Sequence, residues 1–501
     1  MDMFSDIAIG IETAFSLSNL LYCFLGVFLG TLIGVLPGIG PLATIAMLLP
    51  LTFSLDPSTA LIMLSGIYYG AQYGGSTTAI LVNLPGEAAS AVTAIDGYQM
   101  ARNGRAGPAL AIAAIGSFIA GTFATLLIAI AAPFLSMVAL EFGSPEYFSL
   151  VVFGLIASIS LAHGSVPKAL AMICAGVLIG FMGTDLYTGT KRFTFGFYEL
   201  FDGPNIAAIA LGIFGISEIL KNFDHSSPTI GINAISGGLM PTREDLRTSA
   251  WPIARGTLLG SFLGILPGGG ALLSSFASYA VEKRLSKTPE RFGKGAIEGV
   301  AGPESANNAG AQTSFIPMLT LGIPSNAVMA LMVGGMIIQG VAPGPNIIRE
   351  HPDIFWGLII SMWIGNAFLV ILNLPLVGLW ASLLRIPYNA MFPAIVIFSA
   401  IGVYSITYTP FDIYTMIIAG VGGYLLAKVG CEPTPLIMGL ILGPMLEEHL
   451  RRTLIISQGD PSVFFTQPIS AGFLLAACLL LAFTALPYFR RKREVIFVEE
   501  G

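Results

Sequence analysis

The stretch GTLIGVLPGIGP, residues 30–41, places glycine and proline inside an apolar run, and a near-copy, GSFLGILPGGGA, occupies residues 260–271. Aligned from Gly30 and Gly260, six of the twelve positions are identical, and Gly26 matches Gly256 at the same spacing. Both copies break a hydrophobic segment at a Leu-Pro-Gly. This duplication predicts a chain built from two related halves.

The composition is that of a membrane protein. Hydrophobic residues make up 54% of the 501 residues and charged residues only 10%, whereas soluble domains carry about a quarter charged residues. A bilayer-spanning helix needs about 20 apolar residues. The chain therefore predicts an all-α polytopic membrane protein with about 12 transmembrane helices. Runs without Asp, Glu, Lys or Arg cover residues 13–55, 57–86, 108–140, 256–281, 305–348, 354–384, 386–411 and 462–489.

Several functional classes are disfavoured. The net charge is −6 and no basic stripe suits nucleic acid. The four cysteines have neither metal-ligand nor disulfide spacing, and no Walker A, HExxH or G-x-S-x-G motif is present. We therefore expect neither an enzyme nor an ATP-driven pump, and no metal site or cofactor. Two further polar groups, Asp185 with Lys191 and Arg192, and residues 447–452, are expected in loops exposed to water.

Basic residues predict how the halves insert. The tail 490–493 and the loop 282–294 are rich in Lys and Arg, which places both in the cytoplasm. The corresponding segment of the first half, 53–59, carries Asp56 and no basic residue. This reversal predicts two inverted-topology repeats, as in many secondary transporters. We assign residues 1–225 to the first half, 226–250 to a polar link and 251–501 to the second half with its cytoplasmic tail.

The two breaks are candidates for a binding site. In lipid every backbone polar group needs a partner within the protein, so a broken or re-entrant helix at the midplane is tolerated where it lines a cavity or binds something. The following half-helix offers N–H groups to a carboxylate, and the preceding one offers carbonyls to a cation. The alternative is a kink or a close-packing point. The candidate residues are Pro37, Gly38, Gly40, Pro267, Gly268 and Gly270.

A second polar element follows each break, at residues 69–89 and 302–328, and each ends in a proline tip. Hydroxyl and amide groups suit both an anion and a dehydrated cation, although they also form helix–helix hydrogen bonds. Glu304 either binds a cation or proton, since intramembrane acids are usually functional, or caps a helix at the interface. Besides Gln72, the candidates are Ser76, Thr77, Thr78, Asn83, Glu304, Asn307, Asn308, Thr320, Ser325 and Asn326.

These motifs together resemble the large membrane subunit of the tripartite tricarboxylate transporter family. The resemblance rests on GTLIGVLPGIGPLATIAMLLPLTF, YYGAQYGGSTTAILVNLPGE, GPESANNAGAQTSFIPMLTLGIPS and GILPGGG, and it spans about residues 10–490. One departure is Ser325, where the family often has glycine in LTLGIPGS.

The resemblance implies ion-coupled import of di- and tricarboxylates across the bacterial inner membrane, with Na⁺ or H⁺ as the coupling cation. It also implies a small membrane subunit and a periplasmic solute-binding protein that delivers the substrate, and it leaves homo-oligomer formation open. An elevator-like movement is expected by analogy with other inverted-repeat carriers. The alternatives are a Gly-lined anion channel and an ion-coupled carrier without a binding protein.

Overall fold

The computed structural model describes residues 3–36, 40–161, 165–185, 187–224, 238–266, 270–384 and 388–485. Within these ranges the regular structure is helical apart from one short antiparallel pair, β1 (Gly183–Thr184) and β2 (Lys191–Arg192). Four of the described helices are long and apolar enough to cross a membrane: α2 (Leu17–Gly34), α6 (Ala106–Ala139), α17 (Pro352–Leu383) and α19 (Pro410–Lys428). Shorter apolar helices accompany them, so the chain is a helical, multi-pass membrane protein, while the number of spans stays a prediction.

The chain forms two compact units, and each draws on both predicted halves of the sequence. Unit 1 comprises Met1–Met137 and Ala207–Tyr424, and unit 2 comprises Val138–Ile206 and Leu425–Gly501. The helices of unit 2 are α7 (Ser144–Leu161), α8 (Val166–Gly180), η3 (Tyr198–Leu200), α20 (Thr434–Ile456), α21 (Val463–Thr466) and α22 (Pro468–Ala485).

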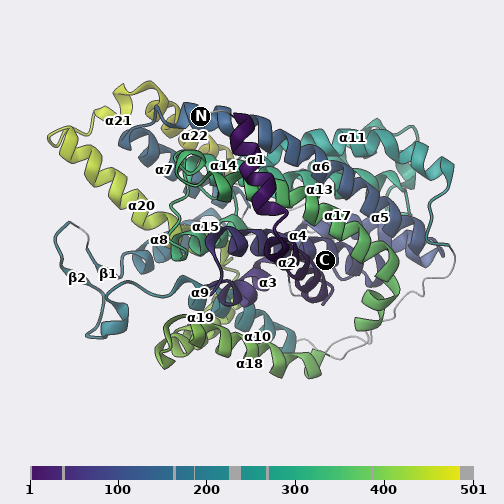
Figure 1. The fold of residues 1–501 in the computed structure, drawn as a ribbon, viewed down its shortest axis with the longest axis horizontal. Coiled ribbons are helices and arrows are strands. Elements are labelled where there is room, and N and C mark those ends of the chain that lie inside the picture. The colour runs from purple at the N-terminus through teal and green to yellow at the C-terminus, as the bar shows by residue number, and fades with distance from the viewer. Residues whose placement is uncertain are drawn as a thin grey trace. The chain divides into compact units, whose positions relative to one another are not determined.

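Unit 1 holds the breaks and the polar elements that the sequence analysis singled out (Figure 1). Its helices are α1 (Met3–Ala14), α2 (Leu17–Gly34), α3 (Pro41–Leu48), η1 (Leu49–Thr52), α4 (Pro57–Val82), η2 (Ala88–Ser90), α5 (Ala91–Arg102), α6 (Ala106–Ala139), α9 (Ile206–Ala210), η4 (Leu211–Ile216), α10 (Ser217–Asp224), α11 (Arg243–Ile265), α12 (Gly270–Leu285), η5 (Pro289–Arg291), α13 (Glu298–Thr313), α14 (Phe315–Leu321), α15 (Ala327–Ile338), α16 (Ile347–Glu350), α17 (Pro352–Leu383), α18 (Tyr388–Thr407) and α19 (Pro410–Lys428).

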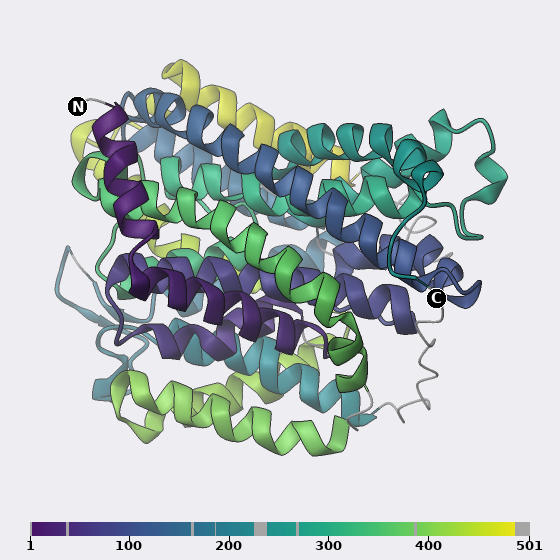
Figure 2. The ribbon, with the colours of Figure 1, turned by 45° about the vertical axis from the view of Figure 1, so that its right-hand side comes forward.

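Glycines bring α2 and α4 into backbone contact, and the two helices run side by side (Figure 2). Gly26, Gly30 and Gly34 share one face of α2 because residues four apart stack on a helix. A Cβ atom on any of the three would lie 2.3 Å from a carbonyl oxygen of α4. Small residues of this kind let membrane helices approach closely. These glycines therefore serve packing.

The pair α11 and α13 repeats this contact. A Cβ atom on Gly256, Gly260 or Gly264 would lie 2.2–2.4 Å from a carbonyl oxygen of α13. These are the three glycines that the sequence alignment pairs with Gly26, Gly30 and Gly34. The duplicated segments thus make equivalent helix–helix contacts in the two halves.

Both Leu-Pro-Gly segments coincide with helix interruptions. Helix α2 ends at Gly34 and α3 begins at Pro41, while α11 ends at Ile265 and α12 begins at Gly270. The predicted site residues Pro37, Gly38, Pro267 and Gly268 lie outside the described residues, as does the basic tail 490–493.

Helices α4 and α13 form the interior of unit 1. Residues 59–82 of α4 and 299–313 of α13 are buried throughout. Helix α13 is nevertheless polar, and it carries Glu304, Asn307, Asn308 and Gln312 into this interior. Buried polar groups must find partners inside the protein. The hydrogen bonds of α13 therefore reveal which parts of unit 1 it joins.

Candidate functional site

Each half places a left-handed residue ahead of its proline tip. The residue that caps the end of α4 is Asn83, with φ of 58°, and the one that caps the end of α14 is Gly322, with φ of 70°. Asparagine and glycine tolerate this conformation best among the amino acids. The tips that follow are Leu84-Pro85-Gly86 and Ile323-Pro324-Ser325. The two polar elements therefore end in equivalent turns, and the predicted residue Asn83 is exposed at the first of them.

The last glycine of each break lies against the tip of its own half. A Cβ atom on Gly40 would lie 3.0 Å from the carbonyl oxygen of Gly86 and 3.9 Å from Glu87 Cβ. A Cβ atom on Gly270 would lie 3.4 Å from Asn326 Nδ2. Glu87 and Asn326 hold equivalent positions, one residue after the tip. Break and tip thus meet in both halves.

Hydrogen bonds hold the second tip in place. Asn326 Oδ1 accepts from the backbone N–H of Met329 at 3.0 Å and so caps α15. Asn326 Nδ2 donates to Ser314 Oγ at 3.3 Å, and Ser325 Oγ donates to the carbonyl oxygen of Ser314 at 3.4 Å. The predicted residues Ser325 and Asn326 therefore lie together beside Ser314, which lies between α13 and α14.

Side chains from both halves meet at the first tip. Asn307 Nδ2 on α13 donates to Glu87 Oε1 at 2.9 Å, and Gln72 Nε2 on α4 donates to Asn307 Oδ1 at 2.5 Å. Thr93 Oγ1 on α5 donates to Glu304 Oε1 at 2.5 Å. Glu304 and Asn307 are three residues apart on α13 and share a face. We call Gln72, Glu87, Thr93, Glu304 and Asn307 the junction cluster.

The junction cluster is buried and acidic. Glu304 is 1% exposed, and Gln72, Thr93 and Asn307 are equally inaccessible, while Glu87 is half-buried. Glu304 lies within α13 instead of at its end, so it does not cap a helix. Among the described residues, no ion pair joins either acid to a basic side chain. Uncompensated buried carboxylates are costly and mark functional sites in membranes.

Other predicted residues have local partners. Ser76, Thr77, Thr78 and Thr320 donate their hydroxyl hydrogens to carbonyl oxygens three or four residues earlier in the same helix. Asn308 Nδ2 donates to Ser117 Oγ of α6 at 2.7 Å and so faces another helix than Asn307 does. The structure brings Glu304 and Asn307 together, and Ser76 on α4 also reaches Glu304. The other side chains named here lie outside the junction cluster.

Sequence reasoning missed two members of the cluster. Glu87 ends the charge-free run 57–86, directly after the Leu-Pro-Gly tip, and that position was the available signal. Thr93 gave no such signal, because its partner Glu304 lies 211 positions further along the chain.

The tripartite tricarboxylate transporter TctA family model matches residues 20–438, which include both breaks, both tips and the whole junction cluster. The chain belongs to the TctA family. The resemblance noted from the sequence is thereby confirmed, and membership of this family makes the chain a membrane transport protein.

Two proteins of Agrobacterium vitis are similar to this chain in sequence. One, an "Uncharacterized 52.8 kDa protein in TAR-I ttuC' 3'region", is 63% identical over 501 residues, which is the full length of both chains. The other, an "Uncharacterized protein in TAR-II ttuC' 3'region", is 62% identical over 241 residues, covering 48% of this chain and all of that protein. No solved structure matches the chain.

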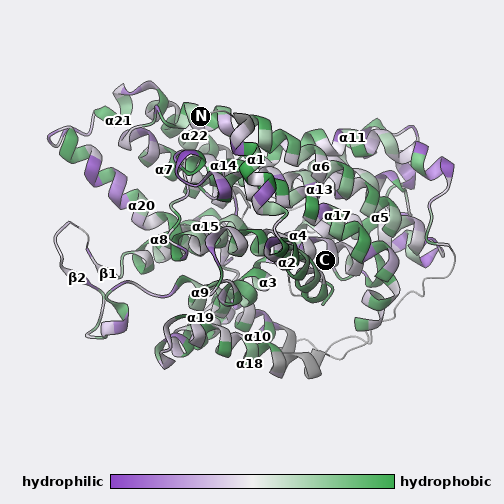
Figure 3. Cartoon of the chain, viewed as in Figure 1, coloured by the Kyte–Doolittle hydropathy of each residue, from purple (hydrophilic) through white to green (hydrophobic). Residues whose placement is uncertain are grey.

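The TctA-family chain has a second polar group, in unit 2, where the expectation of solvated loops is wrong. Residues 447–452 belong to α20, whose hydrophilic residues are visible in Figure 3. Arg451 pairs with Glu447 at 2.6 Å, one helical turn apart, and with Asp185 at 3.0 Å. Arg192 reaches Glu447 at 3.0 Å. The ion pairs between the β1–β2 hairpin and α20 join residues at least 255 positions apart in the sequence, and they hold these charged side chains in ordered structure.

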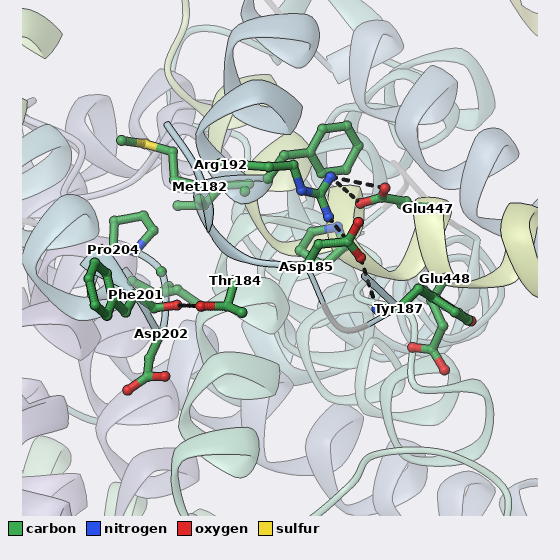
Figure 4. A pocket seen from close by; sticks show the side chains of 16 residues that line it. Met182, Thr184, Asp185, Tyr187, Arg192, Phe201, Asp202, Pro204, Glu447 and Glu448 are labelled. Carbon is green, nitrogen blue, oxygen red and sulfur yellow. Dashed lines mark hydrogen bonds and ion pairs between the residues drawn. The ribbon is translucent and has the colours of Figure 1, made fainter. Parts of the chain in front are cut away.

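Figure 4 shows the part of this network that Arg192 forms with Asp185 and Glu447, at a pocket of about 610 Å³ within unit 2. The pocket is lined by apolar side chains such as Phe181 and Phe201 and by the acids Asp185, Glu447 and Glu448. It contains none of the residues predicted from the sequence as substrate or ion ligands. The network therefore serves to fasten the β1–β2 hairpin to α20.

We predict that Asp185→Asn releases this hairpin. The hydrogen bond from the backbone N–H of Tyr187, with those from Thr188 and Arg451, lowers the pKa of Asp185 to about 2. The carboxylate's contribution is therefore complete above its unfolded pKa of about 4 and disappears as the pH falls towards 2. In the variant, the hydrogen-exchange rate of residues 183–192 should rise several-fold. In the parent protein, this rate, corrected for the intrinsic exchange rate, should stay constant from about pH 5 to 8.

The matched control for this prediction is Glu448→Gln, which removes an acid that lines the same pocket. It should leave hairpin exchange unchanged. Equal protection of the hairpin in Asp185→Asn and the parent protein would contradict the anchoring function of Asp185.

Proposed function

We propose that the chain is the translocating subunit of a secondary, cation-coupled importer of di- and tricarboxylates in the bacterial inner membrane. A periplasmic solute-binding protein hands over the substrate, and a small membrane subunit completes the assembly. Membership of the TctA family supports the transport of tricarboxylates. Coupling is needed because an inside-negative potential opposes anion entry by about 2.3 kcal/mol per charge per 100 mV.

The observation that carries this proposal is that the helix after each half's break contacts the segment after the other half's tip. Helix α12, which follows the second break, packs against η2 at the first tip. Helix α3, which follows the first break, packs against α15 at the second tip. In each half, the helix that follows the break therefore packs against an element that follows the tip of the other half. Half-helix N-termini favour carboxylates, and discontinuous helices of paired repeats are where secondary transporters bind their substrates.

In the proposed cycle, substrate carboxylates lie against the N–H groups that begin α3 and α12. The segments 76–83 and 320–326, which lead into the two tips, provide amide and hydroxyl partners, and a cation binds nearby. An elevator-like movement of the loaded part then exposes the site to the cytoplasm. The C-terminal tail lies on that side, and the two halves span the membrane with opposite orientations.

The test is uptake of radiolabelled citrate and succinate into proteoliposomes that contain this chain, its small subunit and the binding protein. Sodium and pH gradients are imposed separately. Saturable accumulation against a concentration gradient supports a carrier. Conductive flux that does not saturate indicates the Gly-lined anion channel, and full accumulation without the binding protein indicates a carrier that works alone.

We predict that Asn307→Ala lowers citrate uptake at least about tenfold, because loss of the amide leaves Glu87 and Gln72 without a shared partner. Asn308→Ala is the matched control, since the adjacent residue bonds Ser117 of α6 instead. Gel filtration gives the amount of folded transporter, and citrate uptake is divided by that amount. For Asn308→Ala the resulting value should stay within about twofold of that of the parent protein. Equal uptake by both variants would contradict a function for the junction cluster.

A further inference from the structure

The junction cluster has an excess of negative charge that no basic side chain among the described residues balances. The segments that build it, residues 13–101 and 295–348, contain no Lys, Arg or His. Glu87 and Glu304 are therefore left with amide and hydroxyl partners. A carboxylate substrate adds more negative charge to the same region. Like charges in a poorly solvated site repel strongly, so a positive species is required when substrate binds.

Gln72 gives a second and independent sign of a missing species. Its Nε2 is bound to Asn307, whereas no hydrogen-bond donor among the described residues reaches its Oε1, although the side chain is 1% exposed. A buried acceptor without a partner costs about 1–3 kcal/mol. The amide of Gln72 also interacts with the side chain of Glu87, so its unpartnered carbonyl oxygen lies next to that acid. Carboxylate and carbonyl oxygens together are the ligands of a hard cation.

We propose that Glu87, Glu304 and Gln72 bind the coupling cation, Na⁺ or a proton, and that the anionic substrate binds only after this cation. The proposal rests on the carboxylate import proposed above. Neutralising the acids removes their repulsion of the substrate, and by linkage the substrate raises cation affinity by the same factor. An empty cation site therefore disfavours substrate binding, and this makes substrate entry depend on the cation.

The other charged groups around the cluster are already engaged. On α5, Asp96 accepts hydrogen bonds from three backbone N–H groups and from Tyr279. On α12, Glu282 forms a bidentate ion pair with Arg255. Helix α4 contributes Tyr68 and Tyr73, both neutral phenols at physiological pH. Glu87 and Glu304 are thus the groups in this part of the described structure that a cation would change most.

Glu304→Gln and Glu87→Gln test the proposal because each mimics the neutralised acid. In the parent protein, saturating Na⁺ or a pH drop should tighten citrate binding at least about fivefold, the usual lower range of such coupling. In either variant this effect should fall below about twofold. Citrate exchange across the proteoliposome membrane should persist, while accumulation driven by a cation gradient should disappear.

Glu298→Gln is the matched control, since it makes the same change on the same helix at an acid that pairs with Arg291. Thr93→Val is a second test that keeps both carboxylates but removes the hydrogen bond to Glu304. It should shift the cation concentration needed for half-maximal uptake by several-fold. The gradient that drives the parent protein, sodium or pH, identifies the cation.

Two results would overturn the proposal. One is cation-driven accumulation by both glutamine variants at the parent level. The other is loss of exchange together with accumulation in folded variants, which would make the acids substrate ligands. A different result overturns the proposed function itself: the parent protein accumulates neither citrate nor succinate under any gradient. This outcome is seen without the variants, so it is distinguishable from failure of the cation-site proposal.

Discussion

Replacing Gly30 or Gly260 with alanine is expected to abolish production of folded protein. A Cβ atom at either position would lie 2.3 Å from a carbonyl oxygen and 2.8 Å from a Cα atom of the facing helix. Backbone atoms cannot rotate away as a side chain can, so the helices must separate. That separation also breaks the contacts of the flanking glycines. We expect a loss of at least about 3 kcal/mol, the upper range for overpacked sites.

Gly378→Ala is the control for this prediction. Gly378 is also helical, in α17, but no atom lies within 4 Å of its added Cβ. Alanine there should be neutral or stabilising by up to about 1 kcal/mol, because alanine has the higher helix propensity. Gel filtration of fluorescent fusions and thermal unfolding in detergent measure both effects. Parent-like elution and melting of Gly30→Ala and Gly260→Ala would show that the helix pairs are looser than described.

Asp96→Ala should be the next most damaging change. The Asp96 carboxylate, which is fully buried, accepts from the backbone N–H groups of Gly293, Gly295 and Ala296 at 2.8–2.9 Å, and Tyr279 donates to it at 2.9 Å. Alanine leaves three backbone N–H groups without their acceptor, and the N–H of the buried Ala296 loses about 1–3 kcal/mol by itself, while those of Gly293 and Gly295, which are less buried, lose less. We expect destabilisation of at least about 3 kcal/mol and loss of order in residues 293–296, which lead into α13.

Tyr279→Phe provides the graded comparison, since it removes one donor of the four and should cost about 1 kcal/mol. Thermal melting orders the variants, and hydrogen exchange at residues 293–296 locates the effect. A melting temperature for Asp96→Ala equal to that of Tyr279→Phe would mean that water replaces the carboxylate, and the loop would then not depend on Asp96.

Local sequence patterns predicted the helical architecture and both interruptions, because proline and glycine act on their own backbone. The alignment of Gly30 with Gly260 also pointed to equivalent positions, although their packing became evident only when the facing carbonyl oxygens were placed. Glu304 was predicted because an acid at the start of a long uncharged run is informative by itself. The opposite insertion of the two halves stays a prediction.

Long-range partners were beyond such reasoning. Glu87 was missed because its partner Asn307 lies 220 positions away, and nothing near the first tip indicates that contact. The charged residues 447–452 were assigned to a loop because their partners Asp185 and Arg192 come from a distant hairpin. For Ser76, Thr77 and Thr78, composition does not reveal whether a hydroxyl faces a ligand or its own helix.

The glycine-to-carbonyl contacts also restrict motion. With no side chain between α2 and α4 over three successive turns, sliding one helix along the other would drive Cα atoms into oxygen atoms. The same holds for α11 and α13. Each helix pair is therefore expected to move as one rigid body. Any conformational change in unit 1 must displace both helices of a pair together, and the hinge must lie outside the pair.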